Sequence, residues 1–262
     1  MASIDAGRDL PLEPRPYFET YQHAPHFRSK EAEFDAVKLG MWLFLATEVL
    51  LFAGMFVSYA IFRMMYPESF AAGSQHLDWK WGALNTVILL VSSFTVAMSI
   101  RNAQKNQQGW MKINLLITIL CALAFVGIKL IFEYTPKWSG YFFVLDPALH
   151  HYQDAIVQGK TALGGLFQYV DGYGGKRPGY LFDYAYAEYS HEPIWWGVYY
   201  VSTGIHASHV LIGVVLLGWL LIRSFKRHFG PTHYTAVEIV GLYWHIVDMI
   251  WIFLFPLLYL IH

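Results

Sequence analysis

Apolar residues in this chain gather into long uninterrupted runs that are separated by shorter polar segments. A helix needs about 20 apolar residues to cross the roughly 30 Å hydrocarbon core of a bilayer, at a rise of about 1.5 Å per residue. Five runs reach about that length, and they cover residues 37–62, 82–100, 111–132, 194–222 and 237–261. Each run is apolar around its whole circumference, which favours a membrane helix over an amphipathic surface helix. The pattern therefore predicts an all-α integral membrane bundle of five transmembrane helices.

The polar segments divide the chain into a tail, a membrane domain and one large loop. Residues 1–36 are predicted to form a polar N-terminal tail, and residues 37–262 the five-helix domain. Between the third and fourth spans, residues 133–193 form a long loop that is rich in glycine and tyrosine and has no clear period. Loops of this length are uncommon in compact proteins and are usually functional or docked on something. We expect its aromatic residues to cover the membrane surface or a partner subunit.

Lysine and arginine are concentrated on one side of the predicted bundle. With five spans, the two ends of the chain lie on opposite sides of the membrane. The tail and the second and fourth loops share one side, and the cations of these two loops are Arg101, Lys105, Lys112, Arg223, Lys226 and Arg227. The opposite side has only Arg63 and Lys80 in its short loop and no lysine or arginine at the C-terminus. Because short cytoplasmic loops carry the excess of positive charge, we predict the N-terminus inside, and the C-terminus and the 133–193 loop outside.

Composition supports the membrane assignment and excludes other classes. The chain is 56% hydrophobic and 14% charged, whereas soluble domains are about a quarter charged. Its formal net charge of -1 provides no basic surface for nucleic acid, so no nucleic-acid partner is expected. The one cysteine, Cys121, lies inside an apolar run, which excludes a disulfide framework and a four-cysteine metal site.

A carboxyl group lies near the middle of the first span. Glu48 is surrounded in the sequence by large apolar residues such as Phe44 and Phe52. A charged side chain at the centre of a membrane helix costs roughly 2.5–3.5 kcal/mol on insertion scales, so such a residue needs a partner, a proton or a function. Two interpretations remain open. One is a protonated glutamate that is hydrogen-bonded to a neighbouring helix, and the other is a protonatable group close to a proton path.

The fourth and fifth spans contain a second set of buried polar residues. His206 and His209 are three residues apart and share a helix face, while Glu238, His245 and Asp248 lie in the fifth span. These residues could hold a buried metal, but the repeated Glu-x-x-His motif of helical two-metal sites is absent from the sequence. Hydrogen bonding between the fourth and fifth spans explains the same residues at lower cost. We therefore predict a polar network and no metal site.

Charged and aromatic residues near the ends of the spans suggest further contacts. Lys129 and Glu133 are four residues apart near the end of the third span, a spacing that allows a local ion pair. Aromatic residues also lie towards span ends, namely Trp42, Trp110, Trp195, Trp196 and Tyr200. Tryptophan and tyrosine are enriched at membrane–water interfaces, so we expect these residues to be interfacial anchors.

Four sequence blocks together resemble subunit III of the haem-copper oxidases. In chain order they are GMWLFLATEVLLFAGMF around Glu48, LNTVILLVSS from Leu84, STGIHASHVLIG around His206, and EIVGLYWHIVDMIWIFLF from Glu238. The third span matches mainly through Glu133 and its neighbour at the end of the helix. The chain resembles the five-helix bacterial form of the family. It lacks the two N-terminal helices of the seven-helix form, and it has a longer loop before the fourth span.

The resemblance implies a non-catalytic subunit of a bacterial inner-membrane oxidase. Subunit III of cytochrome c oxidase binds no haem or copper, which belong to partner subunits, and it is expected to hold phospholipid and support proton uptake. Its partners would be the catalytic subunit I and the other oxidase subunits, with a neighbouring respiratory complex reached through residues 133–193. Glu48 matches the family's buried, carbodiimide-reactive glutamate. The family's polar network is matched by His206, His209, Glu238, His245 and Asp248. Whether the lipid cleft persists without the two extra helices is left open.

Three alternatives to a cytochrome c oxidase subunit remain. Subunit III of a quinol oxidase has the same fold and role with a different electron donor. The accessory subunit of nitric oxide reductase shares the fold and several motifs. A standalone membrane metalloenzyme that uses His206, His209 and His245 belongs to a different functional class.

Overall fold

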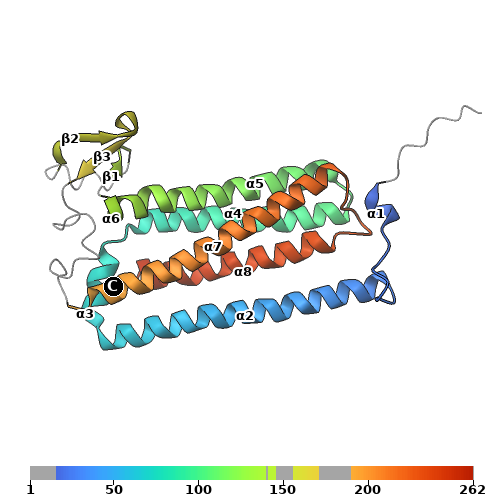
Figure 1. Ribbon diagram of the computed structural model, residues 1–262, viewed down its shortest axis with the longest axis horizontal. Helices are drawn as coiled ribbons and strands as arrows, with labels where there is room; N and C mark the ends of the chain where they lie inside the picture. The colour runs from blue at the N-terminus through green and yellow to red at the C-terminus, as the bar shows by residue number, and fades with distance from the viewer. Residues whose placement is uncertain (1–15, 140, 146–155, 171–189, 262) are drawn as a thin grey trace, which may run out of the picture.

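The computed structural model describes residues 16–139, 141–145, 156–170 and 190–261. Within these ranges, five helices are long and apolar enough to cross a membrane, as the sequence predicts. They are α2 (Lys30–Met65), α4 (Trp79–Gln104), the continuous helix Gln108–Ser139, α7 (Glu192–Phe225) and α8 (Thr235–Tyr259). Figure 1 shows these helices running side by side along the long axis of the molecule.

Two of the long helices, α2 and α4, begin before their apolar runs and are capped there by polar side chains. Ser29 precedes α2 and its hydroxyl accepts a hydrogen bond from the Ala32 backbone nitrogen at 3.2 Å. Asp78 caps α4 in the same way, accepting from the Lys80 backbone nitrogen at 2.9 Å. Such caps satisfy backbone N–H groups that have no partner within the helix. The short helices α1 (Tyr17–Thr20) and α3 (Pro67–Gln75) precede and follow α2.

The third span changes its helical form near its end. Its first part is α5 (Gln108–Ile128), its middle part Lys129–Tyr134 is a π-helix, and its last part is α6 (Thr135–Ser139). A π-helical turn is wider than an α-helical turn and is frequent at functional sites. Lys129 and Glu133, at this turn, are both buried.

Four of the five spans form a tightly packed core, and α2 lies along its side. Helices α4, α5, α7 and α8 pack around the fully buried rings of Trp195, Trp244 and Trp251. A Cβ atom added at Gly213 of α7 would lie 2.5 Å from the Trp244 ring, so only glycine allows these helices to approach so closely. Helix α2 contacts only α3, α7 and α8 among the described elements with substantial contacts. This arrangement leaves space along one face of α2.

The tryptophans at the span ends differ in how far their side chains are exposed. Trp42 and Trp110 are 55% and 62% exposed, so their side chains are free to meet lipid. Trp195 and Trp196 are 0% and 2% exposed, so the prediction that they are interfacial anchors is wrong. They pack against each other and against Tyr199 inside the bundle. Their position near a span end could not distinguish the two outcomes.

A small antiparallel sheet lies in the segment that the sequence predicts as an outer loop. The strands are β1 (Tyr141–Phe143), β2 (Ile156–Ala162) and β3 (Phe167–Val170), in the order β1-β3-β2. Gly164 and Gly165 connect β2 to β3 with φ values of 67° and 94°, which glycine adopts without strain. The sheet lies beside α6 at one end of the bundle (Figure 1). Its pattern was too weak to predict from the sequence, and residues 146–155 and 171–189 of this loop lie outside the described residues.

Candidate functional site

Glu48 of α2 and His209 of α7 form a direct pair between two membrane helices. The Glu48 carboxyl Oε2 lies 2.8 Å from His209 Nε2, and both side chains are 15% exposed. His209 Nδ1 lies 2.8 Å from the Ile205 carbonyl oxygen. A carbonyl oxygen only accepts hydrogen bonds, so Nδ1 must carry a hydrogen. The two residues are then joined by one proton between Oε2 and Nε2, and the pair is neutral overall whichever atom holds that proton.

This pair opens onto an apolar pocket of about 410 Å³. The pocket lies between α2, α7 and α8, and its lining residues are Met41, Phe44, Glu48, His209, Ile212, Leu216, Ile239, Val240 and Tyr243. The Tyr243 hydroxyl donates to the His209 carbonyl oxygen at 3.0 Å and so joins α8 to α7 at this level. A neutral pair in an apolar pocket suits a membrane interior, where an isolated charge is costly.

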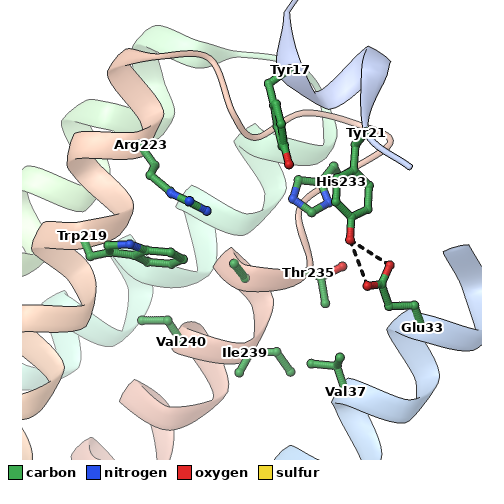
Figure 2. A pocket seen from close by; sticks show the side chains of 11 residues that line it. Tyr17, Tyr21, Glu33, Val37, Trp219, Arg223, His233, Thr235, Ile239 and Val240 are labelled. Atoms are coloured by element: carbon green, nitrogen blue, oxygen red, sulfur yellow. Dashed lines mark hydrogen bonds between the residues drawn. The ribbon is translucent and has the colours of Figure 1, made fainter. Parts of the chain in front are cut away.

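A second pocket of about 450 Å³ lies nearer the N-terminal end of α2 (Figure 2). It shares Ile239 and Val240 with the first pocket, so the two adjoin along α8. We call the two pockets together the α2 groove. Most of the second pocket's floor is apolar, but Arg223 lines it, with its guanidinium 4.7 Å from the Trp219 ring. The groove therefore combines apolar walls with a cation at one end.

The other predicted site residues have separate partners. Glu238 of α8 forms an ion pair with Lys38 of α2 at 2.7 Å. His245 Nδ1 lies 2.7 Å from the Ser93 hydroxyl of α4. The Asp248 carboxyl, which is 3% exposed, has a long contact of 3.5 Å with the Ser92 hydroxyl. These contacts run to the first and second spans, and Ser93 of α4 is a common hydrogen-bond partner of His245 and Asp248. In the part of the chain that the structure describes, hydrogen bonds do not join all five residues into one network between the fourth and fifth spans.

The three histidines considered as metal ligands face different neighbours. His206 is fully buried between the rings of Phe125 and Trp251, while His209 meets Glu48 and His245 meets α4. Neither ring nitrogen of His206 has a hydrogen-bond partner among the described residues. Within those residues, no group of three or more His, Cys, Asp or Glu side chains is arranged to hold a metal ion.

Sequence reasoning missed the size of a buried cluster at the end of the third span. The predicted ion pair between Lys129 and Glu133 is present. Two tyrosines from other helices join it, because Tyr199 of α7 donates to Glu133 Oε2 at 2.8 Å and Tyr259 of α8 also contacts both charged groups. Nothing in the sequence marks these two tyrosines among the many aromatic residues of the chain. Their role depends on how three helices meet.

Comparisons with known proteins find similar sequences among oxidase subunits. The family described as cytochrome c oxidase subunit III matches residues 180–262. A probable cytochrome c oxidase subunit 3 of Nocardia farcinica is 27% identical over 87% of this chain and 89% of its own length. A probable quinol oxidase subunit 3 of Staphylococcus saprophyticus is 24% identical over 89% of this chain and 92% of its own length. A haem-copper oxidase subunit I+III of Aeropyrum pernix is 24% identical over 87% of this chain but only 23% of its own length.

Proposed function

Because the chain belongs to the haem-copper oxidase subunit III family, we propose that it is the non-catalytic third subunit of a terminal oxidase. The five apolar helices make it a multi-pass protein of the bacterial plasma membrane. Cytochrome c oxidase is the main proposal, and quinol oxidase is the alternative that differs only in the electron donor. The relatives do not favour an accessory subunit of nitric oxide reductase, and the separate directions of the three histidines do not favour a standalone metalloenzyme.

The single observation that carries this proposal is the α2 groove with its neutral Glu48–His209 pair. Its apolar walls suit acyl chains, and the Arg223 cation at one end suits a phosphate headgroup. We therefore propose that the groove binds phospholipid. A lipid site of this kind needs only α2, α7 and α8.

The pair also supports a role in proton uptake. It holds one proton beside one pocket of the α2 groove, and the adjoining pocket of the same groove is lined in part by Tyr17 and His233. The proton can move between the carboxyl and the imidazole without changing the net charge of the pair, and a proton that leaves the pair is replaced by one taken up from the other side. We propose that Glu48 and His209 support proton uptake by the complex in this way, without a haem or copper centre in this chain.

The proposed main partner is the catalytic subunit I. The relative from Aeropyrum pernix is named as a fusion of subunits I and III, and such a fusion supports a direct association of the two parts. We further propose that the N-terminus lies inside and the C-terminus outside, so that the loop around the small sheet faces outward. The proposed contact between that loop and a neighbouring respiratory complex is an additional, separate hypothesis.

Co-purification tests the proposed function directly. The full chain carries an affinity tag in its own membrane, is purified in mild detergent, and its partners and lipids are identified by mass spectrometry. We expect a haem- and copper-containing catalytic subunit and stoichiometric phospholipid. Recovery of the chain alone, with a stoichiometric metal that is lost when His206, His209 or His245 is replaced, would instead support the metalloenzyme.

A further inference from the structure

The N-terminal segment crosses one end of the bundle and is held there by a single buried ring. We call residues 16–29 the N-terminal strap. Its Phe18 is 5% exposed and packs against Gly230, where an added Cβ atom would lie 2.6 Å from the Phe18 ring. Thr232 donates its hydroxyl hydrogen to the Phe18 carbonyl oxygen at 2.5 Å. The strap is thus docked on the connection between α7 and α8.

Two tyrosines of the strap form part of the wall of the α2 groove. The Tyr21 ring stacks on the His233 ring at 3.9 Å, and the Tyr21 hydroxyl donates to the Glu33 carboxylate at 2.9 Å. Tyr17 lies 4.5 Å from the His228 ring. Figure 2 shows Tyr17, Tyr21 and His233 on one side of the pocket, with Arg223 extending toward the same space.

We propose that the N-terminal strap is a clamp that retains the headgroup of a phospholipid bound in the α2 groove and so controls its exchange. This inference rests on the proposed lipid binding and adds its regulation. The occupant is a phospholipid because the pocket beneath the strap joins a cation, Arg223, to the apolar walls of the groove, while the Glu33 carboxylate that also lines this pocket accepts a hydrogen bond from Tyr21. The tyrosine hydroxyls and the imidazole are hydrogen-bonding groups that would lie on the polar side of the headgroup.

The strap can open without unfolding the bundle. Among the described residues it is docked mainly through Phe18, the hydrogen bonds from Thr232 and to Glu33, and three tyrosine–histidine contacts, whereas the helices share an extensive core. Segments with few buried contacts open locally at much lower free energy than a core. Undocking of the strap would remove Tyr17 and Tyr21 from the pocket while Arg223 stays on α7.

The test compares lipid release from the purified oxidase complex that contains the full chain. Phe18→Ala removes the docked ring, Gly230→Ala places a methyl group where that ring lies, and Glu19→Ala is a matched control at an exposed neighbouring position. Retained phospholipid per complex is followed by mass spectrometry after dilution into lipid-free detergent. Amide hydrogen exchange of residues 16–29 reports docking of the strap. We expect release about tenfold faster or more in both docking variants, since burial of a phenylalanine ring is a large contribution, and wild-type release in the control.

The outcomes distinguish the clamp from the groove itself. Unchanged lipid release in both docking variants overturns the clamp, whether or not the strap exchanges its amide hydrogens faster. A wild-type complex that retains no phospholipid overturns lipid binding by the groove, which is part of the proposed function. Faster release in both variants, with retention in the wild type and in Glu19→Ala, supports both.

Discussion

Replacing Lys129 by methionine removes one half of an ion pair that the structure encloses completely. The side chains of Lys129 and Glu133 are 3% and 2% exposed, and Tyr199 and Tyr259 donate hydrogen bonds to the Glu133 carboxylate. The Glu133 carboxylate would then remain buried without its nearest cation. Loss of one partner of a buried pair typically costs about 3–5 kcal/mol, because the remaining charge is uncompensated. We expect this loss in the free energy of unfolding of Lys129→Met.

The same reasoning applies to Glu133→Gln, which leaves the Lys129 ammonium group without its carboxylate. The double variant should behave differently. Methionine and glutamine are both neutral, and the glutamine oxygen still accepts hydrogen bonds from Tyr199 and Tyr259. Replacing both members of a buried ion pair is often nearly neutral, so we expect the double variant within about 2 kcal/mol of the wild type. The coupling energy between the two positions should therefore be about 4 kcal/mol or more.

A double-mutant cycle in mixed detergent measures this coupling. The four proteins are unfolded reversibly with a denaturing detergent, and the loss of helix and of tryptophan packing is followed by circular dichroism and fluorescence. Lys80→Met serves as the control, because Lys80 is an exposed lysine of α4 and its replacement should change stability by only about 0.5 kcal/mol. Two outcomes would refute the reasoning that the ion pair is buried and that each charge depends on its partner. They are additive effects of the two single replacements, and a loss of unfolding free energy below about 1 kcal/mol in either single variant.

Three further experiments test other parts of the structure. Glu48→Leu leaves His209 Nε2 without its partner and should cost about 1–3 kcal/mol of stability, whereas Glu48→Gln keeps a hydrogen bond and should assemble normally. Gly213→Ala forces a methyl group to within 2.5 Å of the Trp244 ring and should destabilise the bundle by about 1–3 kcal/mol in thermal unfolding. His233 lies outside the spans, and burial lowers its pKa below 6.5, with Lys30, His228 and Arg223 acting in the same direction and Glu33 opposing them. Docking of the strap should therefore be complete above pH 6.5 and weaken as the pH falls through the lowered pKa, which amide exchange of residues 16–29 at several pH values measures.

Each of these experiments has an internal comparison. Failure of Glu48→Gln to assemble would show that the Glu48 carboxyl itself is structural. Gly218→Ala is the control for Gly213, because its added methyl group meets nothing within 4 Å; equal effects at both positions would contradict the packing argument. The sign of the pH effect follows from the neutral state of His233, since His233 binds a proton more readily when the strap is undocked than when it is docked. His233→Phe keeps an aromatic ring beside Tyr21 and should abolish the pH dependence. A pH dependence that persists in this variant would assign it to another group.

The number and approximate positions of the spans could be predicted because they depend on a one-dimensional quantity. Each span must bury its backbone in hydrocarbon, so a run of apolar residues is required whatever the neighbouring helices do. The first and last residues of the helices could not be predicted as closely as the positions of the spans. The polar caps at Ser29 and Asp78 lie outside the apolar runs, and the strands β1–β3 have too few residues to show a period.

The partners of the buried polar residues could not be predicted in the same way. A helix that is apolar on every side gives no sign of which face meets which neighbour. Glu48 could therefore be identified as a buried group, but its partner His209 is 161 residues away. For the same reason, the sequence did not predict the contact of Glu238 with Lys38. It also did not predict the contacts of Tyr199 and Tyr259 with Glu133.

The sequence by itself determined that the chain crosses a membrane five times and which polar residues are buried there. Those properties follow from the free energy of transferring each segment into hydrocarbon, which depends mainly on its own residues. Only the tertiary structure decided that one carboxyl and one imidazole lie within hydrogen-bonding distance beside an apolar groove, and that a short strap borders its end. Hydrogen bonds require their atoms within about 3 Å. That proximity depends on the rotation and spacing of whole helices, which many residues set together.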